Sequence, residues 1–330
     1  MSDISSSAAT RFHFSTAALP GQDRLAIWRE VFGRKLARLD ISPVEVEHGY
    51  EAEVTALALP GLSISHGSNR GVRSARTREL IGDGNDDLLF GIVTSGSVSV
   101  MQCGREVTIG AGEATMLASA IPNCAIAPGN LTLYNIALPY KALAARVRNV
   151  EDRCARPVSQ DVVAQRLLGF YVKTVFEHPM EHFTEQFRFT AATHIHDLVS
   201  LVLGAPPDVA ELARERGLRA ARLQAVKLEM DKNLGDPELS AAAIAKRLGL
   251  STRYIRRLLA EEGATFSERM LDLRLQRAHH MLTDAARRWQ TISSIAFDLG
   301  FGDLSYFNRT FRRRFGGTPS DIRQSHRFSQ

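Results

Sequence analysis

A stretch of sequence near the C-terminus occurs twice, and this duplication constrains the fold more than any other feature. Residues 244–250 read IAKRLGL, and 51 positions later residues 295–301 read IAFDLGF. With one extra residue in the second turn, YIRRLL at 254–259 then aligns with YFNRTF at 306–311. Each copy predicts a short apolar helix, a glycine turn and a second helix with an arginine-bearing outer face. This pattern is typical of a helix-turn-helix, whose second helix lies in the major groove of DNA.

In the first copy, Ser240 can cap a helix over 241–248 and Ser251 a second helix over 252–262, because their hydroxyls accept hydrogen bonds from unpaired backbone N–H groups. Gly249 supplies the turn, since glycine adopts a left-handed backbone at the lowest cost. The outer arginines of the second helix can reach guanine edges or phosphates. The predicted DNA contacts are the residues at its start and on its outer face: Ser251, Thr252, Arg253, Arg256 and Arg257.

In the second copy, Gly300 is the predicted turn and Asp303 the predicted cap of a helix over 304–315. Phenylalanines at three positions spaced by four residues predict the buried face of that helix. The opposite face carries an asparagine, which can read adenine, and arginines, which can read guanine. The predicted DNA contacts are Leu304, Ser305, Asn308, Arg309 and Arg312. A long helix over 267–283 joins the two copies and sets their spacing.

Charge is distributed unevenly along the chain. Residues 219–330 contain 20 Lys and Arg against 12 Asp and Glu, whereas residues 1–218 contain 21 against 24. The net charge of +5 therefore comes from the C-terminal part, as expected if only that part meets a polyanion. A solvated basic face is the simpler explanation of such an excess, and the duplicated motif favours double-stranded DNA as the partner.

The N-terminal half has a different pattern of apolar residues and glycines. Residues 23–39 have helical periodicity, in which Trp28 is either a core residue or a ligand contact. Residues 44–138 are short alternating runs broken by glycine, including a hairpin over 98–109, which predicts an antiparallel sheet or small β-barrel able to enclose a ligand. Four apolar residues are candidates to line such a pocket, with a plain core role as the alternative: Leu89, Ile92, Met116 and Tyr134.

Two strongly apolar helices are predicted after the sheet, at 162–177 and 182–203. They can pack against the sheet, or residues 160–203 can form the contact of a homodimer. The Gly-Ala-Pro-Pro run at 204–207 predicts a domain boundary, because proline ends a helix and stiffens a linker. The expected domains are 1–204, with the barrel at about 44–138, a linker at 205–217, and the DNA-binding domain at 218–330.

The second copy extends into a longer pattern, I-A-x-x-x-G-F-x-D-x-S-Y-F-x-R-x-F-x-x-x-F-G-x-T-P-S-x-x-R over residues 295–323. This pattern resembles the signature of the AraC/XylS family of bacterial transcription regulators, and residues 225–328 fit that family's DNA-binding domain. Ile322 departs from the pattern, since the family commonly has an aromatic residue there. The N-terminal half is similar, more weakly, to the family's cupin-like sensor domains, through its sheet texture, residues 110–113 and residues 138–139.

The resemblance implies an α+β protein. Its N-terminal part would be a cupin-like β-barrel with flanking helices, and its C-terminal part an all-α domain with two helix-turn-helix units joined by a long helix. It also implies a DNA-binding regulator that responds to a small-molecule effector, contacts RNA polymerase and dimerises, with activation of a catabolic or stress operon as the expected direction. The alternative is an enzyme or small-molecule-binding module that carries an appended DNA-binding domain.

Enzyme chemistry is not favoured by the residues. A metal cupin needs clustered histidines, yet the chain has none between His66 and His178. The helical histidines His178, His182, His194 and His196 are expected to be ordinary surface or half-buried residues, so neither a metal nor a cofactor is predicted.

The cellular location is predicted from two further features. Three scattered cysteines at 103, 124 and 154 favour a reducing cytoplasm. Residues 1–10 are expected to form a loose tail, and no run is apolar enough over about 20 residues to predict a membrane partner.

Overall fold

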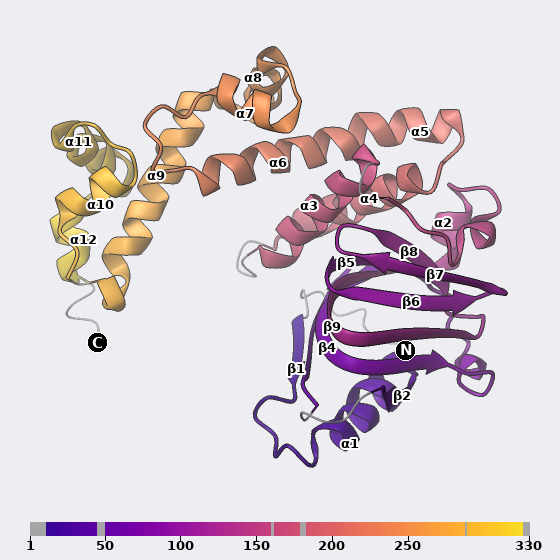
Figure 1. Ribbon diagram of the computed structural model, residues 1–330. Helices are drawn as coiled ribbons and strands as arrows, with labels where there is room; N and C mark the ends of the chain where they lie inside the picture. The colour runs from indigo at the N-terminus through magenta and orange to yellow at the C-terminus, as the bar shows by residue number, and fades with distance from the viewer. Residues whose placement is uncertain (1–10, 45–49, 160–161, 179–182, 288, 326–330) are drawn as a thin grey trace. The chain divides into compact units, whose positions relative to one another are not determined.

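The chain folds into two compact units, residues 1–221 and 222–330, each with its own hydrophobic core. The computed structural model describes residues 11–44, 50–159, 162–178, 183–287 and 289–325 (Figure 1). The predicted tail at 1–10 and His182 lie outside these residues. The α+β fold class is confirmed, with a sheet-rich first unit and a helical second unit.

The first unit is built on a nine-stranded antiparallel sheet. Its strands are β1 (Arg11–Ser15), β2 (Asp40–Pro43), β3 (Ala52–Leu59), β4 (Leu62–Arg76), β5 (Leu88–Ser95), β6 (Ser97–Gln102), β7 (Arg105–Gly110), β8 (Ala114–Ala118) and β9 (Asn123–Leu138). The main path runs β1-β3-β4-β9-β5-β8, while β2 pairs with β4 and β6 joins β9 to β7. No pairing among the described strands links β8 to β1. The cupin-like sheet is therefore open, where the sequence predicted a barrel.

The predicted hairpin over 98–109 is formed by β6 and β7. Its two turn residues, Cys103 and Gly104, have φ values of +53° and +69°. Positive φ at both central residues is the requirement of a type I′ turn, whose twist matches that of the flanking strands. The helix predicted at 23–39 is present as α1 (Arg24–Trp28) and a π-helix (Arg29–Ala37). The π-helix stops at Arg38, which is left-handed with φ +54°, and Pro43 ends β2.

Helices cover one face of the sheet. They are α2 (Tyr140–Ala144), α3 (Val163–Glu177) and α4 (Glu185–Val202), and Figure 1 shows α3 and α4 alongside the strands. Leu88, Phe90 and Ile136 of the sheet share one buried cluster with Leu168 and Ile195 of the helices. A second cluster, which contains Trp28, Val54 and Val100, lies on the other side of the strands. Helices α3 and α4 therefore pack on the sheet, which is one of the two arrangements expected from the sequence.

The segment predicted as a linker, 205–217, is helical and lies against α4. It comprises α5 (Pro207–Ala213) and the start of a π-helical turn (Arg214–Leu218). A Cβ added to Gly217 would lie 3.0 Å from the Asp197 Cβ, so a side chain at this position would crowd α4. The Asp197 carboxylate is 1% exposed, accepts a hydrogen bond from Arg146 and lies 3.4 Å from Arg216 Nε. The segment is thus held to α4 by close packing and by charge.

The stability of the first unit is expected to fall as the pH falls below about 6.5, because of two histidines on α4. Burial lowers the pKa of both His194 and His196 below the ordinary value of 6.5, since an imidazolium is costly to desolvate. As the pH falls, the unfolded chain takes up these protons first. As far as these histidines determine it, the free energy of unfolding is therefore highest above pH 6.5. It decreases as the pH falls toward their lower folded-state pKa.

Urea unfolding of the full chain between pH 7.5 and 5.5 measures this effect. The double variant His194→Gln/His196→Gln is expected to have a flatter pH dependence than the parent protein. A parent unfolding midpoint that does not change across this interval would contradict the prediction.

The second unit is helical, with one core. Its helices are α6 (Arg219–Lys232), which begins in the first unit and continues into the second, α7 (Ala241–Leu248), α8 (Thr252–Ala260), α9 (Phe266–Thr283), α10 (Ile292–Asp298), α11 (Leu304–Phe315) and α12 (Pro319–Ser325). The bounds of α7 and α11 are those predicted from the sequence, while α8 ends two residues earlier than expected. Ile322 on α12 is half-buried against the core, so the departure from the family pattern affects packing.

Candidate nucleic-acid interface

The first helix-turn-helix comprises α7, the turn at Gly249 and α8. The Ser240 hydroxyl accepts a hydrogen bond from Ala243 N at 3.2 Å, and the Ser251 hydroxyl accepts one from Tyr254 N at 3.1 Å. Gly249 has φ +64°, in the left-handed region. Both predicted caps and the predicted turn are therefore confirmed, and they fix where α8 begins.

The two sides of α8 differ sharply. Ile255, Leu258 and Leu259 are buried, at 0%, 1% and 1% exposure, whereas the side chains of Arg253, Arg256 and Arg257 are exposed. The Arg257 guanidinium lies 5.0 Å from the centre of the Tyr254 ring, a cation–π distance that restrains its direction. The outer side of α8 thus presents three cations to a partner while its inner side is fixed in the core. Ser251 is exposed and Thr252 half-buried at the start of the helix.

The second helix-turn-helix repeats this arrangement with an aromatic inner side. Gly300 has φ +77°, and the Asp303 carboxylate caps α11 by accepting from Tyr306 N. Phe307 and Phe311 are fully buried, and the Phe307 ring meets the Phe301 ring edge-on at 4.9 Å.

On the outer side of α11, four predicted contacts are exposed, namely Ser305, Asn308, Arg309 and Arg312. Leu304 differs, since it is half-buried and packs against the core of the unit. The Arg309 guanidinium lies 5.8 Å from the Tyr306 ring centre, which repeats the pairing of Tyr254 with Arg257.

The spacing of the two motifs is set by close contacts around α9. The helix begins with a capping box, in which the side chains of Thr265 and Glu268 accept hydrogen bonds from each other's backbone N–H groups. The Arg274 guanidinium donates to Leu234 O at 2.9 Å and to Asp236 O at 2.8 Å. A Cβ on Gly300 would lie 2.8 Å from Arg274 Nη2, so the second turn also packs tightly on this arginine. One side chain of α9 therefore contacts the segment before the first motif and the turn of the second.

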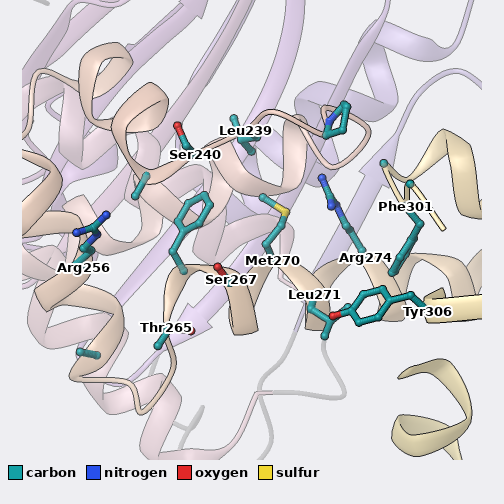
Figure 2. Close-up of a pocket in the computed structure, with 16 residues that line it drawn as sticks. Leu239, Ser240, Arg256, Thr265, Ser267, Met270, Leu271, Arg274, Phe301 and Tyr306 are labelled. Carbon is teal, nitrogen blue, oxygen red and sulfur yellow. The ribbon is translucent and has the colours of Figure 1, made fainter. Parts of the chain in front are cut away.

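A groove of about 760 Å³ separates the two motifs. Its lining includes Thr265, the N-cap of α9, and Ser267 and Met270 of α9, and Figure 2 shows Arg256 and Tyr306 on opposite sides of them. A second hollow, of about 590 Å³, lies on the outer side of α11. It is lined by Asn308, Arg309, Arg312, Arg313, Gly316 and Thr318. Such a concave basic surface suits the phosphates and base edges of nucleic acid.

The first unit contains a cavity of about 160 Å³ within the sheet. Of the four predicted pocket residues, only Leu89 lines it. Ile92, Met116 and Tyr134 lie on the other face of the strands, in the cluster shared with α3 and α4. The reason is strand alternation, which turns Leu89 inward and its neighbours Leu88 and Phe90 toward the helices. The structure does not bring these four residues together.

Among the described residues, no group of three or more His, Cys, Asp or Glu side chains is placed to hold a metal ion. No helix found there has the length and apolar character needed to cross a membrane.

Comparison with known proteins adds the family. A family described as the AraC-binding-like domain matches residues 28–204, and a family described as a helix-turn-helix domain matches residues 244–325. The chain belongs to the AraC/XylS family of transcriptional regulators. The helix-turn-helix match spans both copies of the duplicated motif, so this AraC/XylS regulator is a DNA-binding protein with a sensor-type N-terminal domain.

Individual relatives agree with this assignment. The regulator is 27% identical over 314 residues to the transcriptional activator NphR of Rhodococcus sp, across 93% of this chain and 90% of that one. It is 30% identical over 187 residues to the transcriptional activator RhrA of Rhizobium meliloti (strain 1021), a match that spans only 57% of either chain. The crystal structure of the AraC-like transcriptional activator CuxR covers 82% of this chain with a TM-score of 0.50 and 20% identity. That last likeness shows the fold alone.

Proposed function

We propose that α8 and α11 enter successive major-groove segments on one face of a DNA duplex. The observation that carries the proposal is that both helices bury an apolar side and expose a side rich in arginine. Contacts are made by Ser251, Thr252, Arg253, Arg256, Arg257, Leu304, Ser305, Asn308, Arg309 and Arg312. One helical turn of DNA is about 34 Å, so the duplex bends wherever the spacing set by α9 differs from this repeat.

We propose further that a small-molecule effector binds in the first unit and alters promoter occupancy or contact with RNA polymerase. The cavity within the sheet supports this, because small-molecule sites are typically concave and lined mostly by apolar side chains. The names of NphR and RhrA favour activation, here of a catabolic or stress operon in the cytoplasm. The protein acts as a sensor (1–204), a linker (205–217) and a DNA-binding domain (218–330), and it is not an enzyme.

A homodimer through residues 160–203 is part of the same proposal. Val163 and Phe170 on α3 and Phe189 on α4 are 51%, 42% and 53% exposed. Large apolar side chains at this exposure, on the helices that cover the sheet, suit a self-contact. Two copies of the regulator would then read two operator sites.

The fragment 218–330 is expected to bind the operator without effector and with a steep dependence on salt. Each phosphate neutralised contributes about −0.9 to the slope of log K against log[salt], so several contacts give a large slope. Fluorescence anisotropy with a selected operator, between 50 and 200 mM salt, measures this. A folded fragment that binds no DNA at any salt concentration would contradict an autonomous DNA-binding domain.

A titration of the full chain with candidate effectors tests the regulatory half of the proposal. A regulator changes its operator affinity and releases the small molecule unchanged, which chromatography of the recovered ligand establishes. Turnover of the ligand without any effect on DNA binding would favour the alternative, an enzyme with an appended DNA-binding domain.

A further inference from the structure

The size of the sheet cavity limits what it can hold. Its volume of about 160 Å³ is close to the roughly 150 Å³ of an engineered protein cavity that binds benzene. Two glycines keep this space open, since a Cβ on Gly67 or Gly91 would lie 3.1 Å from Glu53 O or Asn135 Oδ1. A molecule with a single ring fits the cavity, whereas a larger ligand would displace its walls.

The walls are mostly apolar, with an aromatic pair on one side. Trp28 and Phe32 both line the cavity, and their rings stack with centres 4.5 Å apart. Trp28 is only 3% exposed. Valine and leucine side chains of the strands, such as Val72 and Leu131, complete the apolar lining. A planar ring packed between such walls gains both burial and stacking.

The polar groups of the lining are almost all uncharged. They are Ser65, Asn69, Ser74, Thr115, Asn123 and Asn135. Glu53 is the acidic residue of the lining, and none of the described lining residues is a lysine, arginine or histidine. An anionic ligand would therefore lose its hydration without gaining a counter-charge. The lining therefore disfavours an anionic ligand.

One polar atom of the lining is a hydrogen-bond acceptor without a donor in the described part of the chain. Asn69 Oδ1 is buried and has no hydrogen-bond partner among the described residues. A buried acceptor left unpaired is costly, and a ligand hydroxyl or N–H removes that cost. Asn69 also lines an outer hollow of about 650 Å³, together with Glu53 and Leu131. The outer hollow and the cavity therefore adjoin at these shared residues.

We propose that the cavity binds an uncharged, single-ring molecule that carries a hydrogen-bond donor, a class represented by phenol. The ring lies against Trp28, and the hydroxyl donates to Asn69 Oδ1. This inference rests on the proposed function in one respect, namely that the ligand of this cavity is the effector. The assignment of the ligand class itself depends only on the volume and chemistry of the cavity.

The fluorescence of Trp28 reports on binding directly. The chain has two tryptophans, and Trp289 in the other unit is 78% exposed, so Trp289→Phe leaves Trp28 as the single reporter. Phenol added to the full-length variant is expected to change this fluorescence saturably. Benzoate, an anion with the same ring, is expected to leave it unchanged, and toluene, which lacks the donor, to bind at least about tenfold more weakly than phenol. Absence of saturation with phenol, or equal binding of benzoate, overturns the proposal.

Substitution of the acceptor separates binding from folding. Asn69→Leu is expected to weaken phenol binding about tenfold or more while leaving the Tm of the unliganded protein unchanged or higher, because it removes an unpaired buried acceptor. Asn130→Leu is the matched control, since Asn130 is exposed and lines only the outer hollow. Unchanged phenol affinity in a folded Asn69→Leu protein overturns the assigned hydrogen bond.

Operator binding, measured with the same protein preparations, distinguishes a failure of the ligand class from a failure of the proposed function. Normal DNA binding without any response of Trp28 to phenol contradicts the ligand class and leaves the proposed function standing. Phenol binding that does not alter operator affinity supports the ligand class and contradicts the role of this cavity as the effector site.

Discussion

Replacing Arg256 and Arg309 together by alanine is expected to weaken specific DNA binding by about 2–6 kcal/mol, because each arginine that reads a base contributes about 1–3 kcal/mol. The two losses are expected to add, since the side chains lie on different helices, α8 and α11. Both side chains are exposed, so the substitutions should not disturb the core. Anisotropy titrations with operator and with unrelated DNA, at one salt concentration, measure the loss of specificity.

The matched control replaces two exposed cations of the same unit that lie outside α8 and α11. Lys246 is on α7, and Arg287 follows α9. The variant Lys246→Ala/Arg287→Ala is expected to lower affinity for both DNAs slightly and equally, through the loss of non-specific attraction. If the Arg256/Arg309 variant binds operator as tightly as the parent protein, the assignment of α8 and α11 as reading helices is wrong.

Phe307→Ala is expected to destabilise the second unit by about 3–5 kcal/mol, the usual cost of truncating a buried phenylalanine. Phe307 is fully buried and packs between the Phe301 and Phe311 rings, at 4.9 and 5.5 Å. A loss of this size is a large part of the stability of a small domain. DNA binding should then disappear at moderate temperature, because α11 loses its support.

Calorimetry of the full chain measures this effect, since the two units have separate cores. The transition of the second unit should move to lower temperature while that of the first stays in place. Phe297→Ala on α10 is the control, because Phe297 is 54% exposed and its removal should cost little. Equal Tm values for Phe307→Ala and the parent protein would contradict the aromatic core.

The helical half could be predicted in detail from the sequence because its signals are local. Ser240, Ser251 and Asp303 each act within three residues of the start of a helix, and Gly249 and Gly300 act within one turn. The spacing of Phe307 and Phe311 also depends only on helical periodicity. Leu304 was predicted to face outward as a DNA contact, yet it is half-buried, a position that depends on its contacts with the rest of the unit.

The sensor half was harder to predict because its cavity depends on long-range pairing. Alternation along β5 is visible in the sequence, but which face meets α3 and α4 is decided by packing between residues far apart in the chain. Leu89 therefore lines the cavity, whereas Ile92, Met116 and Tyr134 lie in the cluster shared with the helices. A usable signal was present in the small and polar residues at alternate positions, such as Gly67, Asn69 and Gly91.

Along β5, side chains that face the helices alternate with side chains that face the cavity. Leu88 and Phe90 hold the helices to the strands, while Leu89 and Gly91, their direct neighbours, line the cavity. Substitutions at the second set can thus change the lining of the cavity without loosening the scaffold. Related proteins can in this way come to bind different metabolites. The specificity of a biosensor can likewise be changed by substituting every other residue of a strand.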